Sequence, residues 1–235
     1  MHKRRWRDTM LLVSSLGSTQ YRQFGKKMLQ TLKDECNLPV TVYTEDDLTI
    51  PNAEVRSLHD VPGWKEFVEL TNHIEPETYL FDAQRFCHKV YAQLDAFEQG
   101  HRYVVWIDAD VVVKKRFGEK FIRILLDGKM CAYLGRDQSY TETGFIAFDT
   151  HHPDFPEFKK RYRDWYDKGH LFMLPYWIDC MAFDASIFQL DCKNISPEAR
   201  GMMDVFSQSI LKDYMDHDKG LRKHRRASEP LLQTG

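Results

Sequence analysis

Two aspartates, Asp108 and Asp110, stand one residue apart inside the apolar run YVVWIDADVVV. Two carboxylates this close repel each other unless a cation lies between them. The hard divalent ions Mg²⁺ and Mn²⁺ prefer oxygen ligands and are commonly bound by one or two carboxylates together with phosphate oxygens. The pair therefore predicts a metal site that handles a nucleotide diphosphate. From the tripeptide alone, the alternative is that Asp110 caps a turn and Asp108 is solvated.

The residues before the aspartates predict a strand that is covered on both faces. Residues 103–107 form a continuous apolar run, which is typical of a central strand in a parallel sheet. Ligands of such sheets bind beyond the carboxyl ends of the strands, which is where the two aspartates stand. Residues 82–97, just upstream, carry a single apolar stripe at helical spacing, and Gly100 ends that helix.

Strands and helices alternate along the whole chain, which favours one α/β domain over residues 1–235. We expect a Rossmann-like, doubly wound, mostly parallel sheet with helices on both faces. The expected strands are residues 10–18, a stretch from Pro39 to the acids at Glu45, and residues 103–107, 130–134, 143–148 and 177–183. The expected helices are residues 21–33, 64–70, 82–97, 120–127 and 155–168, and a last one that Asp204 caps and that runs to Met215.

Composition sets limits on the class of protein. The 235 residues are 43% apolar and 13% aromatic, which excludes a disordered chain. The 33 basic and 35 acidic residues nearly balance, so the protein as a whole has no positive electrostatic field that would attract a polyanion. The five cysteines lack metal-type spacing and predict reduced thiols of an intracellular protein. The apolar stretch after the basic start is too short for a signal peptide or a membrane span, so we expect a cytoplasmic protein, in the host cytoplasm if it is viral. The C-terminal residues from about 222 onward predict a flexible basic tail.

One rival interpretation is a dehalogenase-like phosphatase. That family also has D-x-D-x-[TV] after an apolar strand, with the first aspartate, here Asp108, as nucleophile. Its motif usually opens the domain, whereas a complete β-α-β unit and a basic helix precede Asp108 in this chain. A second rival is a noncatalytic module that binds a nucleotide with Mn²⁺.

A different resemblance covers more of the chain. RFCHKVYAQLDAF followed by YVVWIDADVVV resembles the stretch before and through the DxD motif of glycosyltransferase family 8, the glycogenin-like and galactosyltransferase-like enzymes of the GT-A fold. Near the C-terminus, HDKGLRK matches that family's H-x-x-G-x-x-K spacing. One departure is that His224 and Arg225 follow the lysine, where the family has Pro-Trp.

The resemblance assigns roles to residues of this sequence. It implies that His217 completes the metal site of Asp108 and Asp110, with Mn²⁺ or Mg²⁺ as the cofactor. It implies contacts to the donor diphosphate from Gly220, where the backbone approaches, and from the charge of Lys223. The other implied donor-binding residues are Arg85, Lys89, Asp108, Gly144, Ser14, Ser15 and Thr44, with Leu16, Glu45 and Asp46 also beside the nucleoside.

Two carboxylates match the positions that act on the donor sugar. Glu142 stands where the family has an asparagine, and Asp179 lies in YWIDCMAF at the place of a D-Q-D-type strand. The alternatives without a catalytic role are that Glu142 is a solvated strand residue and that Asp179 caps a turn or a helix. The resemblance implies retention at the anomeric carbon, with Asp179 or Glu142 as nucleophile or as the group that stabilises an oxocarbenium-like centre.

The predicted reaction is sugar transfer from a nucleoside-diphosphate sugar, a UDP-sugar above all, to an acceptor hydroxyl. Basic clusters at residues 3–7 and 222–226 could bind a phosphate backbone, and the compact layout resembles phage enzymes that glycosylate hydroxymethylated bases in DNA. The alternative acceptor is a saccharide or a lipid-linked sugar. Among aromatic residues, Trp165, Tyr166, Tyr176 and Trp177 could stack on a sugar or a base.

Overall fold

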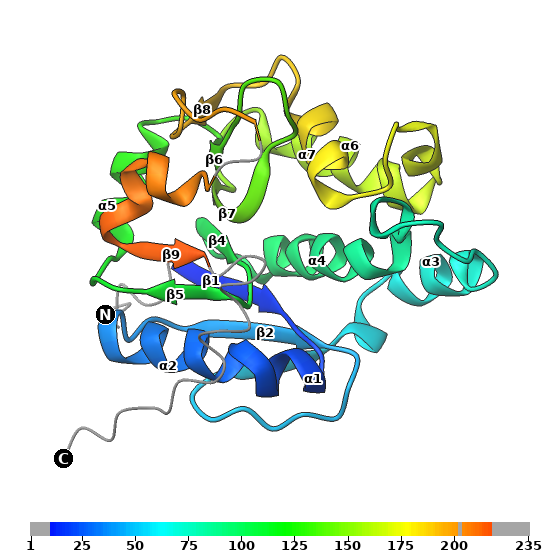
Figure 1. Ribbon diagram of the computed structural model, residues 1–235, viewed down its shortest axis with the longest axis horizontal. Helices are drawn as coiled ribbons and strands as arrows, with labels where there is room; N and C mark the ends of the chain where they lie inside the picture. Colours follow the sequence, from blue (N-terminus) through cyan, green and yellow to red (C-terminus); the bar gives the residue numbers. More distant parts are fainter. Residues whose placement is uncertain (1–9, 202–203, 218–235) are drawn as a thin grey trace.

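A computed structural model describes residues 10–201 and 204–217 (Figure 1). Its centre is a seven-stranded sheet in the order β3-β2-β1-β4-β7-β6-β8. The strands of this sheet are β1 (Met10–Ser15), β2 (Val40–Thr44), β3 (Glu54–Ser57), β4 (Tyr103–Ile107), β6 (Cys131–Leu134), β7 (Glu142–Asp149) and β8 (Cys192–Asn194). All neighbouring strands pair in parallel except those on either side of β7, which is antiparallel to both β4 and β6. The mostly parallel sheet of the sequence prediction is confirmed.

Helices cover both faces of this sheet, as predicted. The helices are α1 (Ser18–Gln20), α2 (Lys26–Glu35), α3 (Trp64–Thr71), α4 (Ala83–Ala96), α5 (Glu119–Leu126), α6 (Phe155–Asp167) and α7 (Asp179–Ile187), and a π-helical segment (Tyr21–Gly25) joins α1 to α2. Short 3₁₀ segments occupy Leu58–Asp60, Tyr79–Phe81, Phe97–Gln99, His170–Met173, Phe206–Gln208 and Ile210–Asp213. One core contains the buried residues of α2 and α5, and the other contains those of α3, α4, α6 and α7.

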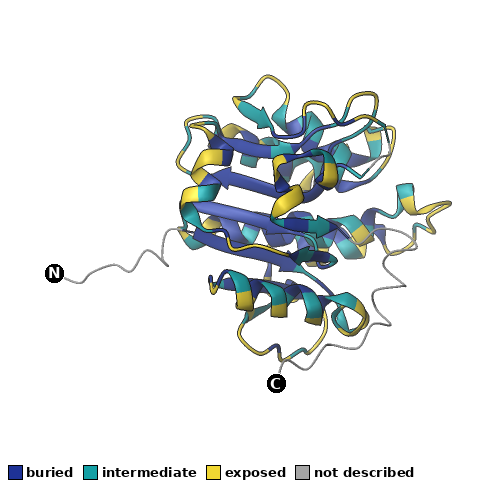
Figure 2. Cartoon of the chain, turned by 60° about the vertical axis from the view of Figure 1, so that its left-hand side comes forward, coloured by how far each residue is buried: buried dark blue, intermediate teal, exposed yellow. Residues whose placement is uncertain are grey.

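The strand sequences account for these two cores. Successive side chains of a strand point to opposite faces, so an entirely apolar strand supplies both. Leu12 and Val105 belong to the core beneath α2 and α5, whereas Leu11 and Val104 belong to the core beneath α4 and α6. Figure 2 shows the result as buried strands between helices whose outer surfaces are exposed.

A second, small sheet lies outside the main one. Strand β5 (Val111–Val113) directly follows the DxD aspartates and pairs antiparallel with β9 (Met215–His217), and Figure 1 shows the two side by side. The Val113 backbone N–H also donates to the Thr31 hydroxyl, at 3.1 Å, which attaches β5 to α2. This pairing brings the last described residues of the chain to the end of β4.

Two predicted elements are wrong. Residues 177–183 are not a strand: α7 begins at Asp179, and its buried residues Asp179, Ala182, Phe183 and Ser186 follow helical spacing. An apolar run this short fits either state, and here the burial pattern decides. The helix predicted after Asp204 is two 3₁₀ segments separated by an extended Ser209, whose hydroxyl accepts from the Leu211 N–H. Serine side chains compete with helical backbone bonding in this way.

Other differences are smaller. The sequence did not predict β3, an edge strand whose residues are all at least partly exposed, nor the three-residue strands β5, β8 and β9. The helix predicted over residues 21–33 begins earlier, at Ser18, and contains the π-helical segment. Among the described residues, no helix is both long enough and apolar enough to cross a membrane. The five cysteines are free thiols, as predicted.

The core gives a first testable prediction. Phe148 of β7 is fully buried, and its ring lies 5.0 Å from that of Phe97 and 5.3 Å from that of Phe158. Replacing Phe148 with alanine leaves a cavity and should lower the free energy of unfolding by about 3–5 kcal/mol. For a chain of this length, each kcal/mol lowers the melting temperature by about 2–4 °C, which calorimetry would measure.

Phe188 provides the matched control, because its side chain is 67% exposed. Phe188→Ala should leave the melting temperature nearly unchanged. Equal losses in the two variants would contradict the assignment of Phe148 to the core.

Candidate active site

The antiparallel pair β5–β9 positions His217 beside the DxD aspartates. Val111 is in register with His217, and the His217 Nε2 lies 2.9 Å from Asp110 Oδ1, across 107 positions of sequence. The imidazole is 3% exposed, and its ring packs against Phe206 at 5.0 Å between centroids. The structure therefore brings together Asp110 and the histidine that sequence analysis paired with it.

Asp108 lies at the carboxyl end of β4, where the main chain turns. Strand β4 ends at Ile107, the Asp108 N–H donates to the Gly144 carbonyl at 2.9 Å, and the Asp108 carbonyl accepts from the Val111 N–H at 3.1 Å. Asp108 and Asp110 thus lie on the turn that follows β4. Both still line one cavity, with different partners.

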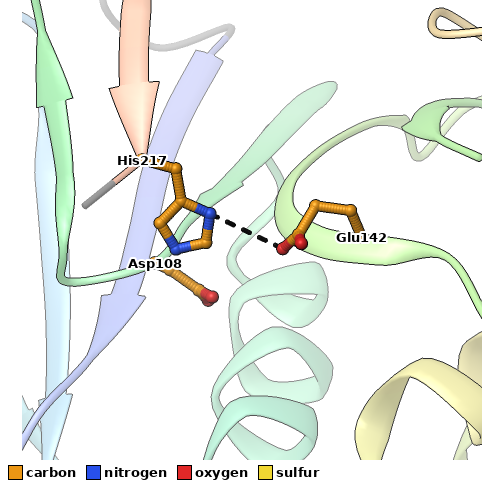
Figure 3. A group of neighbouring side chains, drawn as sticks. All are labelled: Asp108, Glu142 and His217. Carbon is orange, nitrogen blue, oxygen red and sulfur yellow. Dashed lines mark ion pairs between the residues drawn. The ribbon is translucent and has the colours of Figure 1, made fainter. Parts of the chain in front are cut away.

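Glu142, the first residue of β7, lies on the other side of His217. Its Oε1 lies 3.6 Å from His217 Nδ1 and accepts from the Gly144 N–H at 3.1 Å, and its Oε2 lies 4.0 Å from the Arg136 guanidinium. Figure 3 shows Glu142 and Asp108 converging on the imidazole from β7 and from the end of β4. One ligand atom from each of Asp108, Glu142 and His217 lies within 4.8 Å of the other two.

This group has the donor atoms that a divalent ion requires. Carboxylate oxygens suit Mg²⁺ and Mn²⁺, and an imidazole nitrogen is a common further ligand for transition-metal ions. Gly144 provides the space, because a Cβ there would stand 2.7 Å from His217 Cε1 and 3.0 Å from Glu142 Oε1. The residues therefore fit a small divalent cation, and Glu142, which the sequence assigned to catalysis, lies among them.

Lys89 of α4 lies between Asp108 and Asp179, the second candidate catalytic acid. Its Nζ lies 2.8 Å from Asp108 Oδ1 and 2.9 Å from Asp179 Oδ2, and it donates to the Thr143 carbonyl at 3.0 Å. Burial alone would lower the pKa of Lys89, but Asp108 and Asp179 outweigh it and raise that pKa well above the usual range. Lys89 is thus an ammonium group held between two carboxylates in the wall of a cavity of about 510 Å³, and its contact with the donor stays a prediction.

Asp179 occupies the first turn of α7, where the helix dipole favours a negative charge. It is 2% exposed, and its Oδ2 accepts from the Thr143 hydroxyl at 2.6 Å. On the other side of Lys89, the Trp106 indole N–H donates to Asp108 Oδ1 at 2.7 Å. Sequence analysis did not assign roles to Thr143, Trp106 or Arg136: they surround the named acids, but no spacing in the sequence marks them.

Two adjoining cavities open around these residues. One, of about 510 Å³, is lined by the four carboxylates, by His217 and Lys89, and by a set of aromatic residues. The other, of about 600 Å³, lies between the loops after β1 and β2 and is lined by residues 15–20 and 44–46. Ser15, Gln20 and the exposed Arg85 border both cavities.

Most of the residues predicted to contact the nucleoside line the second cavity. They are Ser15, Leu16, Thr44, Glu45 and Asp46. Asp46 accepts from the Ser18 N–H, which lowers the pKa of its carboxyl and ties the two loops together. Ser14 is instead buried within β1. Gly220, Lys223 and the predicted basic tail lie outside the described residues.

No family model matches the sequence, and no curated protein matches it either. Solved structures do resemble the fold. The galactosyltransferase LgtC, in complex with donor and acceptor sugar analogues, has a TM-score of 0.56 at 11% identity, with 90% of this chain and 88% of LgtC covered. A glycosyltransferase involved in glycosylation of the major capsid of PBCV-1 has a TM-score of 0.50 at 13% identity, with 93% and 97% covered.

The bifunctional glycosyltransferase WbbM also resembles the chain, with a TM-score of 0.50 at 13% identity, over 83% of this chain. This chain spans only 40% of the length of WbbM. At such identities the likeness shows the fold alone, and that fold is the predicted GT-A type.

The buried ion pairs of Lys89 yield a prediction on stability. Lys89→Met would leave Asp108 and Asp179 without their shared counter-charge, so we expect the free energy of unfolding to fall by about 3–5 kcal/mol at neutral pH. Because the folded state raises the pKa of Lys89, its contribution is fully present below the unfolded pKa of about 10.4 and is lost only above it. The free energy of unfolding of the wild type, measured with urea between about pH 5 and pH 9, should therefore keep the full contribution of Lys89.

In the variant the deficit should shrink on acidification, because protonation of either carboxylate removes the repulsion between them. Lys65→Met is the control, since that lysine is 68% exposed and pairs with Glu69 at 3.8 Å on the surface of α3. We expect little change there. A deficit in Lys89→Met that is as small as that of the control would contradict the described network.

Proposed function

We propose that the chain is a metal-dependent glycosyltransferase, related to family 8, that moves a sugar from a nucleoside-diphosphate sugar to an acceptor hydroxyl. The observation that supports this most is the convergence of Asp108, Glu142 and His217 at the carboxyl end of β4, in the wall of the 510 Å³ cavity, which adjoins the 600 Å³ cavity. A ligand with a nucleoside at one end and a sugar at the other, joined by a diphosphate, has the matching layout. UDP is the nucleotide that the family resemblance favours.

Asp108, Glu142 and His217 would hold the ion. Asp110 would keep the imidazole oriented, in the manner of the carboxylate–histidine–metal arrangements common in metalloproteins, or would join as a further ligand. A Mn²⁺ or Mg²⁺ ion held by these residues would supply positive charge to the departing diphosphate. Arg85 stands where the two cavities meet and would add charge on the donor side. We assign Gly220 and Lys223 to the same diphosphate from their spacing to His217.

Asp179 is our candidate for the group that acts on the anomeric carbon. It lines the cavity beyond Asp108, and Lys89 and Thr143 fix one of its oxygens. Glu142 contacts His217 and Gly144, so its role would be in the metal site. We propose reaction with retention of configuration, in which Asp179 stabilises positive charge on the sugar ring or attacks it.

Two acceptor classes follow from the sequence. One is a hydroxymethylated base in DNA, which the basic clusters at residues 3–7 and 222–226 would favour, and the other is a saccharide. Both clusters lie outside the described residues. A reaction in the cytoplasm is part of the same proposal.

Metal and donor binding can be tested together. Mn²⁺ binding would be followed by electron paramagnetic resonance of the free ion, and UDP binding by thermal shift with and without Mn²⁺. At UDP concentrations of 100 times the dissociation constant, the wild type should gain about 2.7 kcal/mol of stability. Asp108→Asn, Glu142→Gln and His217→Ala should each weaken Mn²⁺ binding by about tenfold or more.

Asp127→Asn is the control, because Asp127 is an exposed acid whose left-handed backbone an asparagine tolerates. Its Mn²⁺ affinity should equal that of the wild type. Unchanged Mn²⁺ affinity in His217→Ala would remove the metal assignment. Release of phosphate from p-nitrophenyl phosphate, abolished in Asp108→Asn, would instead favour the phosphatase interpretation.

Catalysis requires a separate prediction. Asp179→Asn should bind UDP and Mn²⁺ like the wild type while cleavage of the UDP-sugar falls by about a hundredfold or more, because a charge next to the reaction centre is lost. NMR of the first-formed wild-type product should show the anomeric configuration of the donor. An inverted product would exclude the retaining mechanism, and UDP binding without any cleavage would indicate a noncatalytic module.

A further inference from the structure

Arg136 lies on the loop between β6 and β7 and lines the 510 Å³ cavity together with the four carboxylates of the site. Its side chain is only 3% exposed, although an arginine is almost never buried unless it is paired. The metal and donor assignments above make no use of it. Arg136 is therefore a buried cation of the site whose ligand those assignments do not name.

The guanidinium of Arg136 has few partners within the protein. Its Nε donates to the Tyr140 carbonyl at 2.9 Å, and the group lies over the Tyr140 ring at 5.2 Å from the centroid. One Nη nitrogen lies 4.0 Å from Glu142 Oε2, which is beyond hydrogen-bond distance. Within residues 10–201 and 204–217, no atom accepts a hydrogen bond from either Nη nitrogen, and no other carboxylate lies within 4.0 Å of them. Four of the five N–H groups can therefore donate to a ligand.

Both ends of the loop are fixed to other elements, which holds Arg136 in place. At its start, the Gly135 N–H donates to Asn194 Oδ1 at 3.0 Å, and a Cβ on Gly135 would stand 2.6 Å from Asn194 Nδ2. At its end, the Thr141 N–H donates to Oδ2 of Asp184, on α7, at 3.0 Å. A group that is held before its ligand arrives binds with a smaller loss of entropy.

The two arginines of the 510 Å³ cavity lie toward different ends of the site. Arg85 also borders the 600 Å³ cavity, where we expect the nucleoside. Arg136 instead borders a third cavity, of about 450 Å³, which residues of α7 and β8 line and which shares no residue with the nucleoside cavity. Figure 1 shows α7 and β8 on one side of β4, and α1 and β2 on the other. Arg136 therefore lies on the side of the site away from the nucleoside.

The charges around Arg136 leave room for an anionic ligand. Glu142 is the carboxylate nearest to it among the described residues, and in the proposed function Glu142 binds a divalent ion. The charge of Glu142 is then shared with that ion, and a buried guanidinium without a counter-charge is unfavourable. The planar fork of an arginine pairs best with two oxygens of one carboxylate or phosphate group.

We propose, on the basis of the proposed function, that Arg136 binds a carboxylate or phosphate group of a substrate, at the end of the site opposite the nucleoside. Two sources can supply this group: the carboxylate of a uronic acid as the donor sugar, or a phosphate or carboxylate on the acceptor. Both present two oxygens to the guanidinium in the same geometry. Arg136 thus selects a charged substrate over its neutral counterpart.

The donor source is tested by calorimetry with Mg²⁺. UDP-glucuronic acid and UDP-galacturonic acid are compared with UDP-glucose and UDP-galactose. If the donor sugar supplies the group, one uronic acid should bind about tenfold or more tightly than its neutral counterpart, because it adds a bidentate, charge-assisted pair.

Inorganic phosphate probes the same site independently of either substrate. It should bind to the protein saturated with UDP and Mg²⁺, because UDP lacks the group that Arg136 binds. A preference for a uronic acid assigns that group to the donor sugar. Phosphate binding without such a preference assigns it to the acceptor.

Two variants separate a ligand-binding role from a structural one. Arg136→Gln should lower the phosphate affinity, and any preference for a uronic acid, by about tenfold or more. Arg136→Lys keeps the charge but loses the planar fork, so it should recover only part of both. Each variant should bind UDP with Mg²⁺ as tightly as the wild type, which also shows that it folds.

Arg123→Gln is the matched control, because Arg123 is exposed on α5 and lines none of the three cavities. Its phosphate affinity should equal the wild-type value. The proposal is overturned if the wild type neither binds phosphate in the UDP complex nor prefers a uronic acid, or if Arg136→Gln keeps the wild-type affinities. An equal loss of UDP affinity in Arg136→Gln would also overturn it, because Arg136 would then act on the diphosphate or on the fold. Failure of the wild type to bind UDP would instead overturn the proposed function.

Discussion

The contact between His217 and Asp110 is the interaction on which the rest of the site depends. It joins the last described strand to the turn after β4, across 107 positions, through a three-residue antiparallel pair. The main sheet supplies the other half of the arrangement, because β7 runs antiparallel beside β4 and places Glu142 and Gly144 at the end where Asp108 emerges. If β7 ran parallel to β4, Glu142 and Gly144 would lie at the opposite end of the strands. The reversed direction of β7 is therefore what places Glu142 beside Asp108 and His217.

Charge links the carboxylates of this cavity. Asp108, Asp110, Glu142 and Asp179 line it, Lys89 contacts Asp108 and Asp179, and the Arg136 guanidinium lies 4.0 Å from Glu142. Carboxylates this close together repel one another, and a cation between them lowers that repulsion. Lys89 lies within 3 Å of both Asp108 and Asp179, so in the proposed function a divalent ion would lie on the side of Asp108 that faces His217. The proposed metal site and the orientation of Asp179 would then share one lysine.

The sequence predicted the fold class and most long elements, because residues 82–97, 103–107 and 155–168 carry strong periodic or continuous apolar patterns. It failed where patterns are short or ambiguous: residues 177–183 fit strand and helix equally, and β5 and β9 have three residues each. The family resemblance paired His217 with the aspartates, and the structure places its imidazole 2.9 Å from Asp110. The proximity of Glu142 to His217 was not predicted, since it depends on the direction of β7. The partners of Lys89 were also missed, because a lysine on a polar helix face normally meets solvent, and only the tertiary fold brings Asp108 and Asp179 to it.

Glu142 and Asp179 illustrate how position separates two similar acids. Glu142 extends from the first residue of β7 toward the imidazole, and a main-chain N–H holds the same oxygen that faces the ring. Asp179 sits at the start of α7, where the helix dipole, Lys89 and the Thr143 hydroxyl all stabilise its negative charge. In the proposed function, Asp179 would stabilise a cationic centre on the sugar, and Glu142, which faces the imidazole and Asp108, would bind the metal. The two positions matched by the sequence resemblance would then take one electrostatic role and one ligand role, because different elements carry them.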